Sequence, residues 1–387
     1  MKIAIITSGI LPVPAVQGGA VENLIDYYLE YNETHQLHDI TVFSVYHPLV
    51  KKHPAFRSKY NHYCYINMQS LISRIRARFY GHFHKKECYS YKLEYFFERT
   101  YQHIDKQNYD VIILENRPGF ALKLQRRVNS RIITHLHTNM LYGTDEKIKK
   151  IVQANNKFIV VSNFIKEKIK TVKVPVPIDV VYNGLNTQLF NIQNTSPVLR
   201  KDIGMNKDDF IAVYSGRLVP DKGVKELLQA IVLLSQSHTS IKLLVLGGGN
   251  FGDDKTLTPF INELYEISKL IKGRVFFTGF IPYSQIPAYL ALANVAVVPS
   301  KINDAFPTCC LEATSIGLPV IATNDGGIPE TLIGQKHIII EKDGDMVHDI
   351  AQALITVKDN YDLYRGNKLN PTFTKENFSK YFFESIE

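Results

Sequence analysis

The fold of this chain is decided by residues 211–231, IAVYSGRLVPDKGVKELLQAI. The segment opens with a continuous apolar run, as a buried parallel strand does, and continues after a glycine-flanked turn with helical periodicity. Similar apolar runs, separated by helical patterns, are predicted as strands at residues 2–7, 40–45, 111–116, 131–137, 157–162, 211–216, 241–247, 275–280, 295–300 and 319–323. This alternation predicts an α/β chain with two Rossmann-like, doubly wound parallel sheets.

The domain boundary is predicted near residues 174–191, VPVPIDVVYNGLNTQLFN, because two prolines and Asn183-Gly184 are typical of a linker. We therefore expect one Rossmann-like domain at 1–184, a second at 185–370, and a C-terminal helix at 371–387 that packs back on the first domain. Ligands bind at the carboxyl ends of parallel strands, so the active site is expected in a cleft between two facing sheets.

The composition is that of a soluble globular protein, with 45% hydrophobic and 21% charged residues among 387. No apolar stretch approaches the roughly 18 residues of a transmembrane helix. We interpret MKIAIITSGILPVP at the start as a buried strand and its loop rather than a signal peptide. The four cysteines lack zinc-site spacing and suit a reducing compartment, which predicts a cytoplasmic protein.

The basic charge lies in the first half. Residues 1–190 hold 26 Lys and Arg against 15 Asp and Glu, which leaves 19 against 22 for the remainder. Residues 51–106 alone hold 12 against 4. In a helix, four apolar side chains there would share one face and two arginines another: Leu71, Ile72, Ile75 and Phe79, then Arg74 and Arg78.

Such a cationic amphipathic segment suits an anionic membrane surface. The alternative is an ordinary solvated helix that packs on the sheet. Nucleic acid is not an expected partner, because no recognised nucleic-acid-binding motif accompanies the charge.

Two glycine-containing turns are candidate phosphate sites. Gly18 and Gly19 open a helix after the first strand, where backbone amides and the helix N-terminus favour an anion, although a tight turn chosen for sterics explains them equally well. Arg217 and Lys222 flank a strand-to-helix turn and can converge on one diphosphate. The alternative for the second turn is an exposed basic loop.

A pair of acids follows the strand at 295–300. Asp304 lies in the loop, and a helix starting at Thr308 would place Thr308 and Glu312 on one face. One acid could hold a sugar hydroxyl and the other a ribose hydroxyl, with the amides between them on phosphate. The alternative is that Asp304 caps the helix and Glu312 is solvated.

His135 and His137 end a strand with their side chains on one face. A metal site would need a third ligand, and the sequence offers none in the vicinity. A hydrogen bond from a histidine to a substrate hydroxyl is the preferred interpretation, with burial as the alternative for His135. The Gly247–Gly252 segment matches G-x-G-x-x-G, but it lies in the second half and the next strand ends without an acid, so a nicotinamide enzyme is not expected. We interpret the segment instead as a loop whose glycines allow a close approach of the backbone.

Taken together, these motifs resemble the retaining family 4 glycosyltransferases, also called glycosyl transferases group 1, of GT-B fold. The matching segments are GGAVENL, HLHT, VVSNFIKE, VYNGLNTQLF, YSGRLVPDKGVKELLQAI, FFTGFIPYSQIPAYLALANVAVVPS and DAFPTCCLEATSIGLPVIATNDGGIPE. The resemblance is strong over residues 160–335 and implies an acceptor-binding first domain and a donor-binding second domain. The opening also resembles bacterial relatives acting on surface polysaccharides and spore-coat components.

The resemblance implies a role for each candidate residue. The donor diphosphate would be held by Gly18, Gly19, Arg217, Lys222, Thr308 and Cys309. His137 and Asp304 would be the catalytic residues and would contact the donor sugar together with Phe306. Glu312 would bind the ribose, and the Ile281 backbone would meet the base. Asp304 replaces the usual first glutamate, and Pro307 stands where many members have glycine and so removes one N–H.

The implied reaction retains anomeric configuration by front-face displacement and requires neither metal nor cofactor beyond the nucleotide sugar, for which UDP is favoured. The expected acceptor is a glycan or lipid-linked molecule in bacterial cell-surface polysaccharide synthesis, reached at the inner face of the membrane. The alternatives are a sugar-nucleotide hydrolase or epimerase of the same fold, and a non-catalytic binding or structural protein.

Overall fold

The computed structural model describes residues 1–83, 88–104, 108–194, 198–249 and 257–387. The chain divides into two compact units, residues 1–182 with 376–387, and residues 183–375. The first crossing lies two residues before the predicted boundary. Backbone hydrogen bonds within unit 2 tie the two crossings together, from Leu185 N to Phe373 O and from Lys375 N to Leu185 O.

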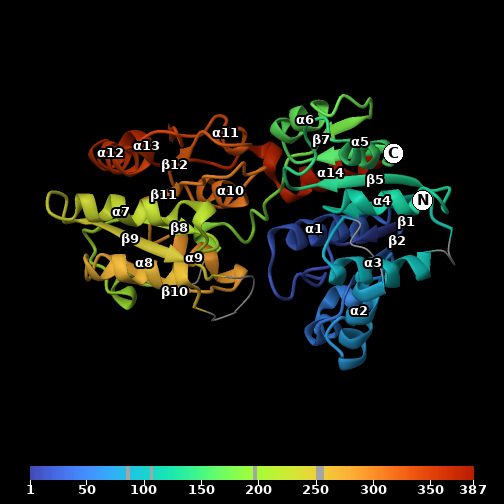
Figure 1. The fold of residues 1–387 in the computed structure, drawn as a ribbon. Helices are drawn as coiled ribbons and strands as arrows, with labels where there is room; N and C mark the ends of the chain where they lie inside the picture. Colours follow the sequence, from blue (N-terminus) through green and yellow to red (C-terminus); the bar gives the residue numbers. More distant parts are fainter. Residues whose placement is uncertain (84–87, 105–107, 195–197, 250–256) are drawn as a thin grey trace. The chain divides into compact units, whose positions relative to one another are not determined.

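Unit 1 contains a seven-stranded sheet in the order β3-β2-β1-β4-β5-β6-β7, with parallel pairing throughout. Its strands are β1 (Lys2–Ile6), β2 (Asp39–Val45), β3 (Asn61–Ile66), β4 (Val111–Glu115), β5 (Arg131–Leu136), β6 (Lys157–Val160) and β7 (Ile178–Val180). Its helices are α1 (Ala20–His35), α2 (Leu71–Phe83), α3 (Tyr91–Ile104), α4 (Ala121–Leu124), α5 (Glu146–Gln153), α6 (Asn163–Lys170) and α14 (Lys375–Ile386) (Figure 1).

Alternate residues of β1 fill two cores on opposite faces of this sheet. Ile3 and Ile5 pack with residues of α1 and α14, whereas Ala4 and Ile6 pack with residues of α3 and α4. Both faces are covered, so the strand is apolar without interruption. The C-terminal helix α14 is therefore part of the core of unit 1, although unit 2 separates it from the rest of that unit in the sequence.

Unit 2 contains a six-stranded parallel sheet in the order β10-β9-β8-β11-β12-β13. Its strands are β8 (Phe210–Ser215), β9 (Ile241–Leu246), β10 (Val275–Gly279), β11 (Val295–Val298), β12 (Val320–Thr323) and β13 (His337–Ile340). Its helices are α7 (Val224–Leu234), α8 (Pro259–Lys269), α9 (Ile286–Leu290), α10 (Thr308–Ser315), α11 (Ile328–Thr331), α12 (Met346–Asp359) and α13 (Tyr361–Tyr364).

Three strands were not expected from the sequence. The proline-containing linker at 174–191 includes β7, which pairs with β6 and completes the first sheet. The others are β3 and β13, the edge strand beside β2 and the edge strand beside β12. Each of these three strands lies at a sheet edge, whereas every central strand was predicted from its apolar run; β10 is the one edge strand among those described that was also predicted.

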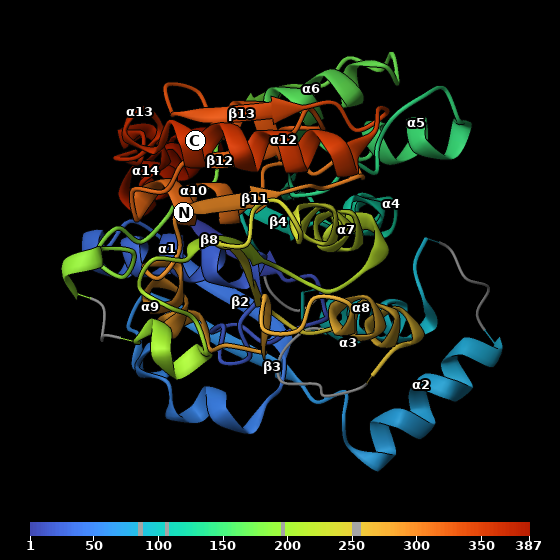
Figure 2. The same cartoon turned by 90° about the vertical axis from the view of Figure 1, so that its left-hand side faces the viewer.

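The helix α2 lies at the periphery of unit 1, beyond α3 (Figures 1 and 2). Of its thirteen residues, all of them described, Ala77 alone is buried. The large apolar side chains of the helix are between 53% and 75% exposed: Leu71, Ile72, Ile75, Phe79 and Phe83. The alternative of an ordinary helix that packs its apolar face on the sheet is therefore wrong for α2.

Candidate functional site

The sequence motifs of unit 2 meet at one place in its sheet. In the order β10-β9-β8-β11-β12-β13, the chain first adds β9 and β10 on one side of β8 and then adds β11, β12 and β13 on the other side. The switch point of this parallel sheet therefore lies between β8 and β11. Ligands of doubly wound sheets bind at the carboxyl ends of the strands flanking such a switch point. The loop with Arg217 and Lys222 follows β8, and the loop with Asp304 follows β11.

Glycines allow the loops to approach one another closely. Gly223 has φ +69°, and a Cβ there would lie 1.8 Å from the carbonyl oxygen of Pro299 in the neighbouring loop. Gly247, after β9, has φ +135°, and its Cβ would lie 2.0 Å from the carbonyl oxygen of Gly216. No other residue type fits either position without displacing backbone. The interpretation of Gly247 and Gly248 as a close-approach loop agrees with this contact, while Asn250–Gly252 lie outside the described residues.

Lys222 and Asp304 form a two-pronged ion pair across the switch point. The Nζ atom of Lys222 lies 2.7 Å from Oδ1 and 2.6 Å from Oδ2 of Asp304, and both side chains are about one-fifth exposed. Arg217 is exposed in the same turn, and its carbonyl oxygen accepts a hydrogen bond from the Tyr214 hydroxyl. The fold thus pairs Lys222 with an acid 82 residues further along the chain, and the exposed Arg217 lies in the same turn as Lys222.

The helix α10 begins at Thr308, as predicted. Its N-cap residue is Pro307, which makes no side-chain cap, so the alternative that Asp304 caps this helix is wrong. The Thr308 hydroxyl donates to Glu312 Oε1 at 3.1 Å, which confirms their shared face. Glu312 is buried, so the alternative of a solvated Glu312 is also wrong. This burial raises the pKa of Glu312 to about 7.

The remaining candidate residues of unit 2 are Phe306, Cys309 and Ile281, and their surroundings differ. The Phe306 side chain is buried against Phe373, and its carbonyl oxygen accepts a hydrogen bond from Asn183. Cys309, in the first turn of α10, interacts electrostatically with Lys222, and its pKa is raised by a hydrogen bond with Cys310 and by burial. Ile281 is half-buried beyond the end of β10, at the edge of the sheet.

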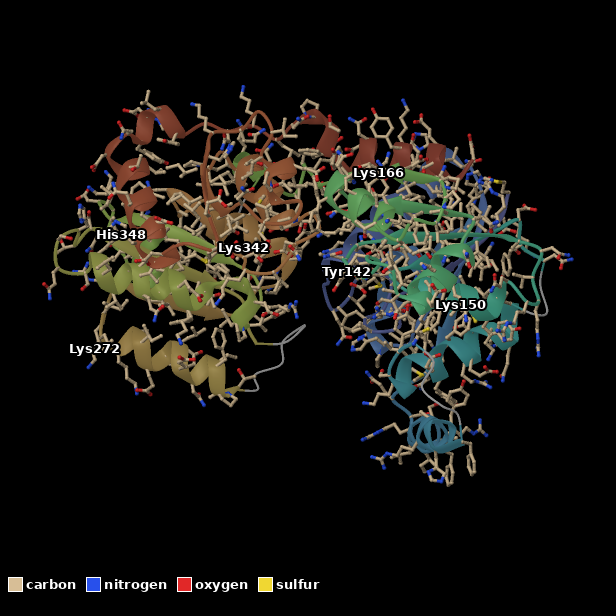
Figure 3. The ribbon with its side chains drawn as sticks, turned by 45° about the horizontal axis from the view of Figure 1, so that its top comes forward. Tyr142, Lys150, Lys166, Lys272, Lys342 and His348 are labelled. Carbon is tan, nitrogen blue, oxygen red and sulfur yellow. The ribbon has the colours of Figure 1, made fainter. Side chains whose placement is uncertain are left out.

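The loop that carries Asp304 is held from behind by the segment after β12. Gly327 N donates to Asp304 O at 2.7 Å, and a Cβ on Gly326 would lie 2.1 Å from that same oxygen. The buried Asp325 pairs with Lys342, which follows β13 (Figure 3). The backbone of Asp304 is therefore held by contacts that do not involve its carboxylate.

Unit 1 has the same kind of switch point between β1 and β4. Gly19 is the N-cap of α1 with φ +107°. The Glu22 carboxylate folds back to this end of the helix and accepts a hydrogen bond from Ser8 Oγ at 3.3 Å. Burial raises the pKa of Glu22 to about 7. Gly18 has φ +75° and no heavy atom within 4 Å of its Cβ position, so its immediate surroundings are open.

The histidines have a third partner that the sequence did not reveal. Glu115, the last residue of β4, lies 2.9 Å from His137 Nε2 and 3.2 Å from His135 Nδ1. The prediction that no third potential metal ligand lies nearby is therefore wrong, because ligand atoms of these three residues fall within 4.8 Å of one another. Strand order explains the error, since β4 and β5 are adjacent in space but separated in sequence.

The segment Glu115–Arg117 connects the loops at this switch point. Asn116 Oδ1 accepts hydrogen bonds from His137 N at 3.2 Å and Thr138 Oγ1 at 2.9 Å. Arg117 Nε donates to Ser8 O at 3.1 Å. Asn116 has φ +58°, a conformation that non-glycine residues adopt at a cost and that often accompanies functional sites. Three polar residues directly after an apolar strand were the signal available in the sequence.

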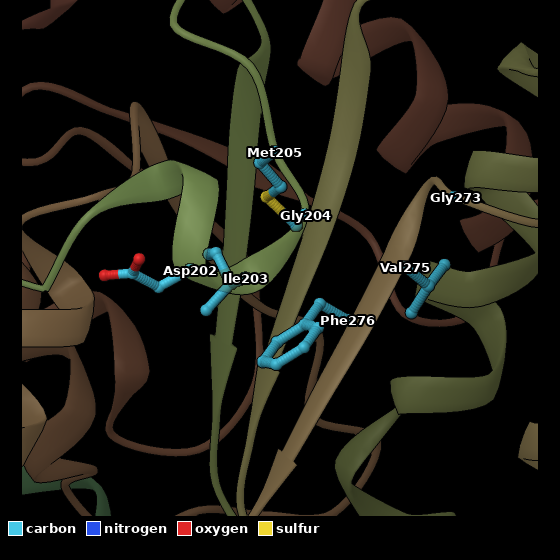
Figure 4. A pocket seen from close by; sticks show the side chains of 7 residues that line it. All are labelled: Asp202, Ile203, Gly204, Met205, Gly273, Val275 and Phe276. Carbon is cyan, nitrogen blue, oxygen red and sulfur yellow. The ribbon is translucent and has the colours of Figure 1, made fainter.

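A surface pocket lies elsewhere in unit 2. Asp202, Met205, Val275 and Phe276 are among its lining residues (Figure 4). Val275 is the first residue of β10, so the pocket is at the amino edge of the sheet, opposite the switch-point loops. None of the candidate site residues lines it.

Both units are Rossmann-like domains with a parallel sheet and a switch point, and comparison with known proteins identifies the family. Residues 34–189 match the family described as Glycosyltransferase Family 4, and residues 196–368 match Glycosyl transferases group 1. The chain belongs to these group 1 glycosyltransferases and has their GT-B fold. It is an enzyme of the glycosyltransferase class.

Three similar proteins illustrate this relationship. Spore coat protein SA of Bacillus subtilis is 26% identical over 90% of this chain and 86% of its own length. The lipopolysaccharide 1,2-N-acetylglucosaminetransferase of Salmonella typhimurium is 25% identical over 73% of this chain and 72% of its own. The crystal structure of Anabaena HepE in complex with UDP-glucose aligns over 100% of this chain and 99% of that one, with a TM-score of 0.74 and 19% identity.

Among the residues that the structure describes, no helix has the length and apolar character needed to cross a bilayer.

Proposed function

We propose that the protein transfers a hexose-type sugar from a UDP-sugar to a hydroxyl group of a glycan or lipid-linked acceptor, with retention of anomeric configuration. The observation that carries this proposal is the Lys222–Asp304 pair at the switch point of unit 2, beside the exposed Arg217. UDP as the nucleotide is supported by the UDP-glucose complex of the similar Anabaena protein.

In the proposed reaction, the acceptor oxygen bonds to the anomeric carbon on the face from which the diphosphate leaves, and the acceptor proton passes to the departing phosphate oxygen. Arg217 and Lys222 neutralise the charge that grows on the diphosphate, together with the first amides of α10 at Thr308 and Cys309. No metal or cofactor is required in this scheme.

The other candidates bind the rest of the donor. Glu312 accepts hydrogen bonds from the ribose, the Ile281 backbone meets the base, and the backbone at Phe306 borders the sugar. From unit 1, the amides of Gly18 and Gly19 contribute to the diphosphate, and His137 contacts the sugar.

In this scheme, donor binding replaces the Asp304 carboxylate with the diphosphate as the partner of Lys222. Without donor, the two carboxylate oxygens of Asp304 occupy Lys222. A diphosphate carries more charge than one carboxylate and competes for the ammonium group. Once released, Asp304 is available to accept hydrogen bonds from sugar hydroxyls, so occupation of the phosphate site prepares the sugar site.

The donor assignment is tested with the variant R217A/K222A. UDP at a hundredfold excess over its Kd should stabilise the wild-type protein by about 2.7 kcal/mol and raise its Tm, and should leave the variant unshifted. Sugar transfer should fall by more than about 1,000-fold, since each lost cation removes stabilisation of the leaving group.

The matched control is K269A, which removes an exposed lysine of α8 that pairs with Glu266. It should behave as wild type. Transfer that survives in R217A/K222A would refute the diphosphate assignment. Release of free sugar from the UDP-sugar at the same rate with and without acceptor would favour the hydrolase alternative, and absence of any nucleotide binding would favour the binding-protein alternative.

The acceptor is proposed to be a lipid-linked intermediate of bacterial cell-surface polysaccharide synthesis, reached from the cytoplasm at the inner face of the membrane. The name of the Salmonella relative supports a surface glycan. The exposed face of α2 supports the membrane contact, because five exposed apolar side chains adjoin Arg74, Arg76 and Arg78, all three exposed. Apolar burial at the lipid interface and attraction of arginines to anionic headgroups act together on such a helix.

Vesicle flotation tests this contact. Vesicles containing phosphatidylglycerol should carry the wild-type protein, neutral phosphatidylcholine vesicles should carry much less, and I72S/I75S/F79S should stay in solution. L270S is the control, because Leu270 is 74% exposed on the other unit. Equal flotation of the triple variant and the wild-type protein would contradict docking through α2.

A further inference from the structure

The carboxylate of Glu115 is enclosed by hydrogen-bond donors. Tyr28 Oη lies 2.9 Å from Oε1, His137 Nε2 lies 2.9 Å from Oε2, and His135 Nδ1 lies within 3.3 Å of both oxygens. The Glu115 and His135 side chains are fully buried, and that of His137 is 5% exposed. Phe382 of α14 stacks on Tyr28 with 4.1 Å between the ring centroids. The C-terminal helix therefore covers the network on the side of Tyr28.

The charge state of the network follows from this arrangement. Burial alone would raise the pKa of Glu115, but the interactions with His135 and His137 outweigh it and lower the pKa to about 2. Burial lowers the pKa of His137 to about 4. At neutral pH the group therefore contains a carboxylate anion and a neutral His137.

The proton positions follow in turn. An ionised carboxylate only accepts hydrogen bonds, so the ring nitrogens that face it must carry protons. A neutral imidazole has one donor and one acceptor nitrogen. His137 is thereby held with its proton on Nε2, and its Nδ1 is a bare acceptor. This Nδ1 atom is buried and has no hydrogen-bond partner within the described residues, and the next residue, Thr138, is exposed.

A metal ion is a poorer explanation of the same cluster. A histidine that ligates a metal usually donates its other ring N–H to a carboxylate, carbonyl or water. The outer nitrogens here, His135 Nε2 and His137 Nδ1, are buried without such a partner in the described structure. Metal binding would place protons on them and leave two buried donors unsatisfied, whereas the hydrogen-bonded network leaves lone pairs there.

We infer that Glu115 is a positioning residue for sugar transfer: it fixes His137 in the Nε2–H tautomer, so that Nδ1 accepts a hydrogen bond from a hydroxyl group of the substrate sugar. This inference rests on the proposed function, and it adds the direction of the hydrogen bond. A hydroxyl that donates to Nδ1 is required, so a deoxy or fluoro sugar that lacks this donor is discriminated against.

The tautomer is read directly by long-range ¹H–¹⁵N NMR of the histidine-labelled wild-type protein at pH 7, with H137N used to assign the His137 signals. We expect the Nε2–H tautomer for His137. A proton on Nδ1, a doubly protonated ring, or a stoichiometric bound metal in the purified protein would overturn the inference. This measurement requires no activity, so it remains decisive even if UDP-sugars are not the donor.

Kinetics separate positioning from a structural role. E115Q keeps the size of the side chain but adds N–H donors, so it no longer fixes one tautomer. We expect kcat to fall about 100-fold with little change in KM for the UDP-sugar, as for a displaced reactive group. D179N is the control, since it removes a carboxylate that binds Lys157 and Ser385 in the same unit and should leave kcat unchanged.

A double-mutant cycle completes the test. H137N replaces the imidazole but retains an acceptor near the Nδ1 position, and it loses the group that reaches Glu115. If Glu115 acts through His137, E115Q should have no further effect on kcat in the H137N background. Additive losses in the double variant, or wild-type kcat in E115Q, would overturn the inference. Absence of transfer in the wild-type protein, with the expected tautomer present, would instead count against the proposed function.

Discussion

The two switch points share one topology and differ in chemistry. Around β8 and β11, Arg217 is exposed, Lys222 is about one-fifth exposed, and the acid that faces Lys222 is held by backbone contacts. Around β1 and β4, the acids Glu22 and Glu115 are buried and engaged by neighbouring side chains. In the proposed reaction, unit 2 therefore supplies charge to the ligand, whereas the buried acids of unit 1 orient side chains of their own unit. Because the two units share one kind of switch point, this difference lies in the residues of their loops.

The largest expected effect comes from a substitution in α14 that uncovers the network around Glu115 in unit 1. Phe382→Ala removes a fully buried ring stacked on Tyr28, and should lower the free energy of unfolding by about 3–5 kcal/mol through the cavity it leaves. Tyr381→Ala, the adjacent and 44% exposed aromatic residue, should change it by less than about 0.5 kcal/mol. Urea unfolding measures both, and equal losses would show that α14 does not contribute to the core as described.

The loop contact of unit 2 can be broken at one glycine. Gly223→Ala should lower the free energy of unfolding by about 2–5 kcal/mol. The new Cβ would collide with the Pro299 carbonyl oxygen, and an alanine is also strained in the left-handed conformation of this residue. Gly273→Ala has a similar φ of +75° but no heavy atom within 4 Å of the new Cβ, so it should cost only about 1–2 kcal/mol. Thermal unfolding compares the two, and a Gly223→Ala variant as stable as Gly273→Ala would contradict the close approach.

The stability of the wild-type protein should depend on pH through Glu312 in unit 2. Burial raises the pKa of this residue from 4.5 to about 7. Because the folded protein binds this proton more tightly than the unfolded chain, the stabilisation is complete below pH 4.5 and is lost as pH rises through 7. Relative to Glu312→Gln, the wild-type protein should therefore lose up to about 3 kcal/mol across this range.

The same titration should act on ligand binding in the opposite direction. UDP affinity should rise through pH 7 in the wild-type protein, since the ionised carboxylate is the better acceptor for ribose hydroxyls. Glu312→Gln should abolish the change. Isothermal calorimetry at several pH values measures it, and an unchanged pH profile in the variant would remove Glu312 from the donor site.

The sequence predicted what is encoded locally. Central strands such as β1 and β8 are continuous apolar runs, and the turn from Gly216 to Gly223 contains its glycines and cations within a few residues. Three of the four edge strands, β3, β7 and β13, escaped prediction; β3 alternates polar and aromatic residues, and β7 follows prolines. The Lys222–Asp304 and Glu115–His137 pairs were also invisible, since each requires knowing which strands are neighbours. Their residue types were informative, but their partners depend on sheet order.

The discontinuity of unit 1 has a consequence for synthesis on the ribosome. Domains usually fold in the order in which they emerge, from the N-terminus onward. Here residues 376–387, which supply Phe378, Phe382, Phe383 and Ile386 to the unit 1 core, are translated only after the whole of unit 2. Unit 2 is continuous in sequence and can therefore complete its core first. Until the last helix is made, the nascent unit 1 exposes the surface that α14 covers, which is the stage at which this chain most needs protection from aggregation.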